Sequence, residues 1–193
     1  MKLLRLFLSF GWEGEDRIFI DMIEQGIMPE KGAYLDVGAH HPFKASNTAL
    51  LYMRGWSGIN VDIINERLFK WFRRRDKFIY GYVMADVSYY FPNKLFTSDV
   101  DVAQDRLGKG WECSVTTGIP NIDPKQFKDY TLLCLDIDGG DYKVLRALME
   151  VYQPPFICAE NILEEQRTID YYLESLNYKK CCQTLHNGIW KKN

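Results

Sequence analysis

The sequence of 193 residues has no surplus of positive charge, no long apolar run and no closely paired cysteine motif. Lys and Arg number 24 against 26 Asp and Glu, so the basic excess expected of a protein that tracks a nucleic-acid backbone is missing. No stretch approaches the roughly 20 apolar residues of a membrane span. We therefore expect a soluble protein with neither a nucleic-acid partner nor a membrane span. The sequence leaves the oligomeric state open.

The five cysteines show no CxxC spacing, and two of them, Cys134 and Cys158, lie in apolar runs typical of buried strands. Neither a disulfide framework nor a zinc site is indicated. The apolar N-terminal stretch is interrupted by Arg5 and is not followed by a small-residue cleavage site, so it does not fit a signal peptide. The cytoplasm is the expected location.

No repeat, linker or low-complexity segment divides residues 1–193, which we interpret as a single domain. Short apolar runs predict buried strands, and segments with helical spacing predict helices between them. Such alternation is typical of an α/β fold with a doubly wound, mostly parallel sheet covered on both faces. The strands are expected at 33–37, 58–62, 78–86, 130–136 and 155–160, and the helices at 15–27, 44–54, 65–75, 141–151 and 162–176.

Two segments depart from this alternation of strands and helices. The tail carries Asn187-Gly188 between two β-like runs, which predicts an antiparallel hairpin with its tight turn at that dipeptide. His186 falls in this turn, and no role is predicted for it. Region 92–130 scatters Gly, Pro, Asp and Thr, and a long irregular segment inside a compact domain is usually functional. We expect it to form a lid or a substrate-binding insertion.

The basic run Arg73-Arg74-Arg75 closes one of the predicted helices. The last turn of a helix favours cations, because the carbonyl end of the helix dipole is negative. The run is therefore interpreted as a solvated helix end.

Asp36, Gly38 and His40 lie at the end of the first predicted strand. In doubly wound sheets, ligands bind outside the carboxyl ends of the strands. Gly38 lets the backbone pass close to a ligand, and Asp36 can hold the ammonium group of an amino-acid-like cofactor. His40 or His41 could act as a base or be a hydrogen-bonded structural residue. His41 and Pro42 stand where the glycines of a dinucleotide-binding motif would be, which argues against that motif.

Asp62 ends the second predicted strand, 24 positions after Gly38. In this fold such a carboxylate accepts hydrogen bonds from the two hydroxyls of a ribose. The alternative is that Asp62 caps the helix that begins near Asn65.

Asp136 and Asp138 follow the most apolar strand, and Glu160 and Asn161 follow its predicted neighbour. Asp136 must find a cation, a metal or a hydrogen-bond donor at the edge of the cleft. Asp136, Glu160 and Asn161 would together offer oxygen ligands suited to Mg²⁺ or Mn²⁺, which could lower the pKa of a substrate hydroxyl. The alternative is that Glu160 and Asn161 cap the following helix.

Taken in order, these residues resemble the FkbM family of methyltransferases. The matching segments are Gly14-Glu15-Asp16, YLDVGAHHPFKASNTALLYMRGWSGINVD at 34–62, Arg75-Asp76, LDIDGGDYKVLRAL at 135–148 and PPFICAEN at 154–161. The resemblance implies the class I methyltransferase fold, whose sheet usually ends in an antiparallel hairpin. It also implies S-adenosylmethionine as cofactor and, commonly, methyl ether formation on sugars, glycans or polyketides.

Carried over by position, the resemblance implies that Asn47 and Thr48, with Asp36 and Gly38, lie near the methionine end of the cofactor. The resemblance also implies that Asp86 binds the amino group of the adenine. This sequence has Asp138-Gly139 where the family usually has Glu-Gly, and Asp62-Ile63 where it often has Glu-Pro. The first departure affects the choice of catalytic base, because the side chain of Asp138 is shorter than that of glutamate.

The expected reaction is methyl transfer from the cofactor to a hydroxyl of a sugar or glycan, with Asp136, Asp138 and His40 as candidate catalytic residues. Most of the rate acceleration would come from positioning the two reactants. A non-catalytic cofactor-binding protein of the same fold, a methyltransferase acting on a non-sugar small molecule and an NAD-dependent dehydrogenase remain alternatives.

Overall fold

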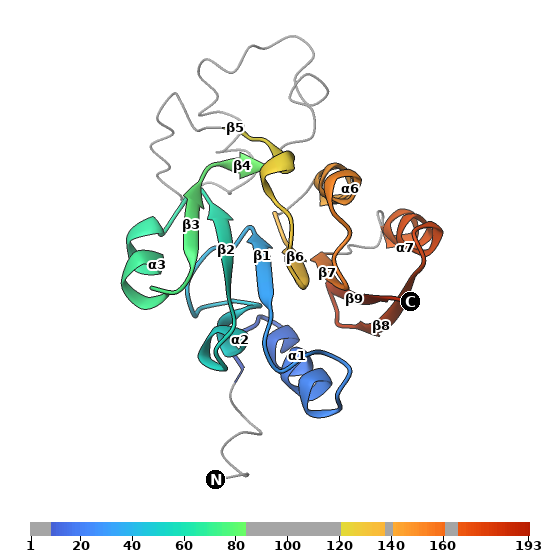
Figure 1. Ribbon diagram of the computed structural model, residues 1–193, viewed down its shortest axis with the longest axis horizontal. Helices are drawn as coiled ribbons and strands as arrows, with labels where there is room; N and C mark the ends of the chain where they lie inside the picture. Colours follow the sequence, from blue (N-terminus) through green and yellow to red (C-terminus); the bar gives the residue numbers. More distant parts are fainter. Residues whose placement is uncertain (1–8, 84–120, 138–140, 161–165) are drawn as a thin grey trace.

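The computed structural model describes residues 9–83, 121–137, 141–160 and 166–193, which form an α/β domain (Figure 1). The helices are α1 (Glu15–Glu24), α2 (Ala49–Met53), α3 (Glu66–Phe72), α6 (Asp141–Val151) and α7 (Gln166–Ser175), with a 3-10 turn η2 at Pro124–Gln126. The strands are β1 (Ala33–Val37), β2 (Ser57–Asp62), β3 (Lys77–Tyr80), β4 (Tyr82–Val83), β5 (Asn121–Ile122), β6 (Leu132–Leu135), β7 (Phe156–Glu160), β8 (Tyr178–Gln183) and β9 (Asn187–Lys192).

Seven strands form the main sheet in the order β3-β2-β1-β6-β7-β9-β8, and β4 pairs with β5 in a separate small sheet. The first five are parallel to one another, whereas β9 runs antiparallel to both β7 and β8. The expected doubly wound, mostly parallel sheet with a C-terminal antiparallel hairpin is confirmed. Its order reverses between β1 and β6, the place where sheets of this kind bind ligands.

Apolar side chains on the two faces of the sheet pack into two separate cores. Leu35, Leu133 and Ile157 point to the face covered by α6 and α7. Tyr34 and Leu132 point to the opposite face, where α1 and α2 pack (Figure 1). Because successive side chains of a strand alternate between faces, a strand buried on both sides is apolar throughout. This explains the nearly continuous apolar runs that the sequence shows.

Gly38, which follows β1, packs directly against the backbone of Asp136, which follows β6. Its φ is +84°, and a Cβ placed on it would lie 1.6 Å from the backbone oxygen of Asp136. No side chain fits there, so glycine is required both for the backbone conformation and for the close approach.

The hairpin is present, but its turn is not where the sequence places it. Asn187 and Gly188 belong to β9, and Thr184, Leu185 and His186 connect the two strands. A Cβ on Gly188 would meet the Trp190 ring at 2.2 Å, so packing against an aromatic ring explains this glycine. The prediction of a turn at Asn187-Gly188 is therefore wrong.

The interpretation of the basic run as a solvated helix end is wrong for Arg73. Its side chain is fully buried, whereas Arg74 and Arg75 are exposed. Arg73 ends α3 and reaches back to the segment between β1 and α2. A buried cation is stable only when its N–H groups find acceptors, and the acceptors here come from distant parts of the chain.

Several smaller expectations are also adjusted. The helix expected at 44–54 begins only at Ala49, because Ala45 adopts a positive φ of 53°. The strand expected at 78–86 ends at Tyr80. Of the region expected to form a lid, residues 92–120 lie outside the described part, whereas Phe127 and Tyr130 are buried in the core. Within the described ranges, no helix has both the length and the apolar character needed to cross a membrane.

Candidate functional site

A hollow of about 350 Å³ opens at the carboxyl edge of the sheet, where the strand order reverses. We call it the sheet-edge pocket. Its volume is at the lower end of the range for small-molecule sites, about 300–1,000 Å³. It is lined by Trp12, Gly38, His40, Ala45, Asn47, Asp136, Glu160, His186 and Asn187.

Two carboxylates, Asp136 after β6 and Glu160 at the end of β7, line this pocket. No Lys or Arg is among its described lining residues. Opposite charges attract strongly in a partly desolvated cleft, so the pocket favours a ligand that carries positive charge or donates hydrogen bonds.

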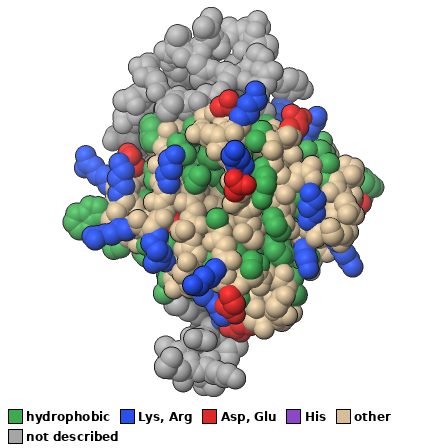
Figure 2. Space-filling model, in the orientation of Figure 1, with side chains coloured by type: hydrophobic (Ala, Val, Ile, Leu, Met, Phe, Trp, Pro, Cys, Tyr) green, Lys and Arg blue, Asp and Glu red, His purple; other side chains and the backbone are tan. Residues whose placement is uncertain are grey.

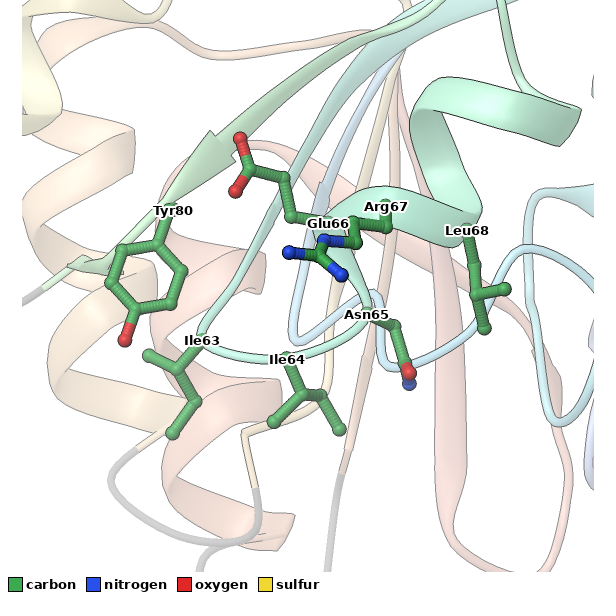
Figure 3. A pocket seen from close by; sticks show the side chains of 7 residues that line it. All are labelled: Ile63, Ile64, Asn65, Glu66, Arg67, Leu68 and Tyr80. Carbon is green, nitrogen blue, oxygen red and sulfur yellow. The ribbon is translucent and has the colours of Figure 1, made fainter. Parts of the chain in front are cut away.

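A second hollow, of about 420 Å³, lies beside the turn that follows β2 (Figure 3). We call it the side pocket. Ile63 and Ile64 provide apolar surface there, and Tyr80 stands beside Ile63 at the end of β3. Asn65, Glu66, Arg67 and Leu68 complete the lining. Its apolar floor suits a flat, uncharged ring better than a charged group.

Asp62 lines neither pocket, but its carboxylate is hydrogen-bonded to residues that line each of them. One of its carboxylate oxygens accepts a 2.7 Å hydrogen bond from the backbone N–H of His40, which lines the sheet-edge pocket. The other accepts from the N–H groups of Ile63 and Ile64, at 2.6 and 3.0 Å, which line the side pocket. Burial raises the pKa of Asp62, while these hydrogen bonds act in the opposite direction.

The hydrogen bonds of Asp62 restrict what else it can hold. A carboxylate has about four lone-pair positions. Three are directed to backbone N–H groups of His40, Ile63 and Ile64. One position is then left, which is sufficient for one ribose hydroxyl in this conformation. Asp62 does not cap α3, whose N-cap residue is Asn65.

Asp36 does not line either pocket. It is buried, and it accepts a 2.7 Å hydrogen bond from the Thr48 hydroxyl. Burial raises the pKa of Asp36 to about 6, although the Thr48 hydrogen bond and the Arg73 charge lower it. Thr48 is fully buried, whereas its neighbour Asn47 lines the sheet-edge pocket. Cofactor contacts of Asp36 and Thr48 stay predictions.

The two neighbouring histidines differ in their surroundings. The His40 backbone is left-handed at φ 49°, and its buried Nδ1 has no hydrogen-bond partner among the described residues. The Nδ1 of His41 accepts from the backbone N–H groups of Phe43 and Lys44, which requires the neutral ring. Burial, together with the charges of His40, Lys44 and Arg73, lowers the pKa of His41. His41 is thus a turn residue, and His40 is the one that reaches the pocket.

One side of the sheet-edge pocket brings residues 12–15 together with residues 186 and 187, and we call it the far wall. Glu13 pairs with the ring and the backbone N–H of His186. The buried Glu15 accepts a 2.9 Å hydrogen bond from the Asn187 side-chain amide. That bond fixes the amide, and the buried Oδ1 of Asn187 has no partner among the described residues. A buried acceptor without a partner is uncommon in a folded protein, and this one belongs to a residue that lines the pocket.

The sequence predicts no site role for Trp12, Glu13, His186 or Asn187. The Asn-Gly dipeptide predicts a turn, whereas Asn187 lies in β9 and lines the pocket. The one signal for this contact was the Gly14-Glu15-Asp16 segment of the resemblance. The structure gives that segment a physical role, because Glu15 binds the hairpin and Asp16 accepts from Ser9 and Phe10.

Three predicted site residues, Asp86, Asp138 and Asn161, lie outside the described residues. Of the predicted metal ligands, Asp136 and Glu160 line the same pocket. No group of three or more His, Cys, Asp or Glu side chains that could hold a metal ion occurs in the described segments.

Comparison with known proteins leaves the family open. No protein-family model matches the chain, and no curated relative is found. The resemblance to the FkbM family therefore stays a prediction. Among solved structures, the C-terminal domain of precorrin-6Y C5,15-methyltransferase from Rhodobacter capsulatus is similar to this chain at 8% identity and a TM-score of 0.45, over 91% of this chain and 86% of that one. At that identity and score, the likeness bears on neither activity nor substrate.

Proposed function

We propose that the chain is an S-adenosylmethionine-dependent O-methyltransferase, with a sugar or glycan hydroxyl as acceptor. The observation that carries the proposal is the sheet-edge pocket, which lies at the reversal of strand order and is lined by two carboxylates. The cofactor carries a sulfonium and an ammonium group, so negative lining charge suits it. Membership of the FkbM family is part of the same proposal.

Each part of the cofactor has a matching surface. Gly38 allows the backbone to approach the amino-acid end, and Asp136 offers a carboxylate to the ammonium group. Asp62 has one lone-pair position for a ribose hydroxyl. Ile63 and Ile64 offer apolar surface to the adenine ring in the side pocket. The hydrogen bonds of Asp62 to residues of both pockets support a ligand that extends from one into the other.

The bound cofactor supplies an electrophilic methyl group attached to sulfur. The chain must then hold the acceptor hydroxyl in line with that methyl and take up its proton. His40 lines the pocket and is one candidate base. His186 is another, because pairing with Glu13 orients its ring toward the same pocket wall. Asp138 is the third candidate, from the sequence alone.

The far wall supports a neutral, donor-rich acceptor. Trp12 stands exposed at the pocket, with 76% of its surface accessible, and offers an aromatic face. The amide of Asn187 lies in the same wall, and its Oδ1 has no partner among the described residues. With the carboxylates of Asp136 and Glu160 in the lining, an anionic acceptor is disfavoured.

Calorimetric titration with S-adenosylmethionine, S-adenosylhomocysteine and NAD⁺ tests the cofactor. Binding of the two sulfur compounds and not of NAD⁺ is expected, and the reverse result would favour a dehydrogenase. Release of S-adenosylhomocysteine in the presence of a panel of methyl glycosides then tests the activity. Cofactor binding without turnover on any acceptor, sugar or non-sugar, would favour a non-catalytic binding protein.

Metal assistance is a separate part of the proposal. Asp136 and Glu160 are the two described side chains that would contribute ligands from this pocket. Turnover should fall in EDTA and return with Mg²⁺ or Mn²⁺ if a metal orients the acceptor. Turnover that EDTA does not change would contradict metal assistance. The proposal of methyl transfer would still stand.

A further inference from the structure

Arg73 is a fully buried arginine that lines neither pocket. Its guanidinium contacts the segment between β1 and α2, which supplies Gly38, His40, Ala45 and Asn47 to the sheet-edge pocket. Nothing in the sequence indicates this connection, because Arg73 belongs to a run of three arginines of which the other two are exposed.

Each N–H-bearing nitrogen of the guanidinium has a protein acceptor. Nε and Nη2 both donate to the backbone oxygen of Pro42, at 3.0 and 2.7 Å. Nη2 also donates to the Ser46 hydroxyl at 2.6 Å, and Nη1 donates to the Thr48 hydroxyl at 2.8 Å. The Tyr34 hydroxyl accepts from Nη1 at 3.1 Å, and Asp76 provides the counter-charge at 3.4 Å.

These contacts fall on both sides of Ala45. Ala45 has a φ of 53°, in the left-handed region where a residue with a Cβ is strained. Such strain costs on the order of 1 kcal/mol or more, and it persists only where surrounding contacts hold the backbone. Pro42 and Ser46, which flank Ala45, are both bound to Arg73.

We infer that Arg73 is a positioning residue for the pocket: it holds residues 42–48 in the strained conformation that presents Ala45 and Asn47 to the ligand. The affinity test of this inference rests on the proposed function, because it uses a cofactor product as the ligand. The planar guanidinium reaches Pro42, Ser46 and Thr48 at once, which a lysine ammonium on a flexible chain cannot do. Arg73 acts through this segment, and it does not itself touch the ligand.

The test compares R73K and S46A with R74A, which changes the adjacent, exposed arginine. S46A removes the hydrogen bond between Ser46 and Arg73 and leaves the guanidinium in place. It therefore tests the inference even if R73K does not fold. Dissociation constants for S-adenosylhomocysteine are measured by calorimetry at a temperature where circular dichroism shows each variant fully folded. R73K and S46A should bind about tenfold more weakly or worse, the equivalent of one charge-assisted hydrogen bond, and R74A should match wild type.

A role confined to global stability would lower the melting temperature of R73K and S46A while leaving the affinity of the folded variants unchanged, and that result overturns the inference. Amide hydrogen exchange of residues 43–47 in the ligand-free protein provides a readout that does not depend on the cofactor. Faster exchange there in S46A than in R74A supports the positioning role, even if wild type fails to bind the cofactor. Equal exchange in the two variants overturns it.

Discussion

The hydroxyl of Thr48 donates a 2.7 Å hydrogen bond to the carboxylate of Asp36 beneath the sheet-edge pocket. Burial is the largest influence on this carboxylate and raises its pKa from 3.8 to about 6. A carboxyl group whose pKa is higher in the folded state stabilises the fold below its unfolded pKa and loses that stabilisation as the pH rises. The stabilisation that Asp36 contributes is therefore lost between about pH 4 and pH 6.

D36N should remove this pH dependence, because asparagine is neutral and still offers an oxygen to Thr48. A shift of about two units corresponds to about 3 kcal/mol. At pH 7.5 the variant should be more stable than wild type by up to that amount, and the difference should shrink toward pH 4. Urea unfolding across this range measures it. D21N is the surface control, and a D36N difference that is constant with pH would contradict the assignment.

Replacing Asp62 should affect cofactor binding more than chemistry at saturating cofactor. D62A removes the acceptor for three backbone N–H groups and, with it, the proposed ribose acceptor. We expect the affinity to fall by about 10- to 100-fold, the equivalent of one or two hydrogen bonds to a charged group. Calorimetry with D21A as control measures the change, and unchanged affinity would place the ribose elsewhere.

Gly38 and Gly55 offer a matched pair of glycine replacements. Both have a positive φ, +84° and +99°, but a Cβ on Gly55 meets nothing within 4 Å. G55A should therefore cost only the backbone strain, about 1 kcal/mol. G38A must also separate Gly38 from the Asp136 backbone, so we expect it to cost several times more and to weaken cofactor binding. Similar losses of unfolding free energy would mean that the two strand ends can move apart easily.

Trp12 and Trp71 form a second matched pair, exposed by 76% and 73%. Trp12 lines the sheet-edge pocket, whereas Trp71 lies on α3 and lines neither pocket. With an acceptor identified by the glycoside panel, W12A should raise the acceptor KM by about tenfold and leave cofactor affinity unchanged. W71A should change neither. Equal KM values for the two variants would remove Trp12 from the acceptor site.

On the face shown in Figure 2, Lys and Arg side chains are spread over several elements and are not gathered over one of them. This agrees with a sequence in which 24 basic residues are balanced by 26 acidic ones.

The sheet could be predicted from the sequence because strands buried on both faces must be apolar throughout. The run around Leu132–Leu135 is the clearest example, since all four residues are buried. Gly38 and Asp136 could also be placed at the same edge, because parallel strands end together. These inferences need only local composition and the order of the elements.

The far wall and the role of Arg73 could not be predicted, because they depend on contacts between distant residues. Glu13 and His186 lie 173 positions apart, and Arg73 and Pro42 lie 31 apart. A buried arginine looks like its exposed neighbours in a sequence, since its burial is decided by acceptors contributed elsewhere. The turn at Asn187-Gly188 failed for a similar reason, because Gly188 is matched to the Trp190 ring.

The junction between Glu13, Glu15 and the residues around His186 has a consequence for synthesis. A ribosome makes residues 13–15 of this wall before the main sheet and residues 186 and 187 after most of it. The sheet-edge pocket cannot close on a nascent chain until position 187 has left the exit tunnel. A polypeptide released before that point would retain β1, β2 and β6 yet lack the amide and imidazole that complete the wall.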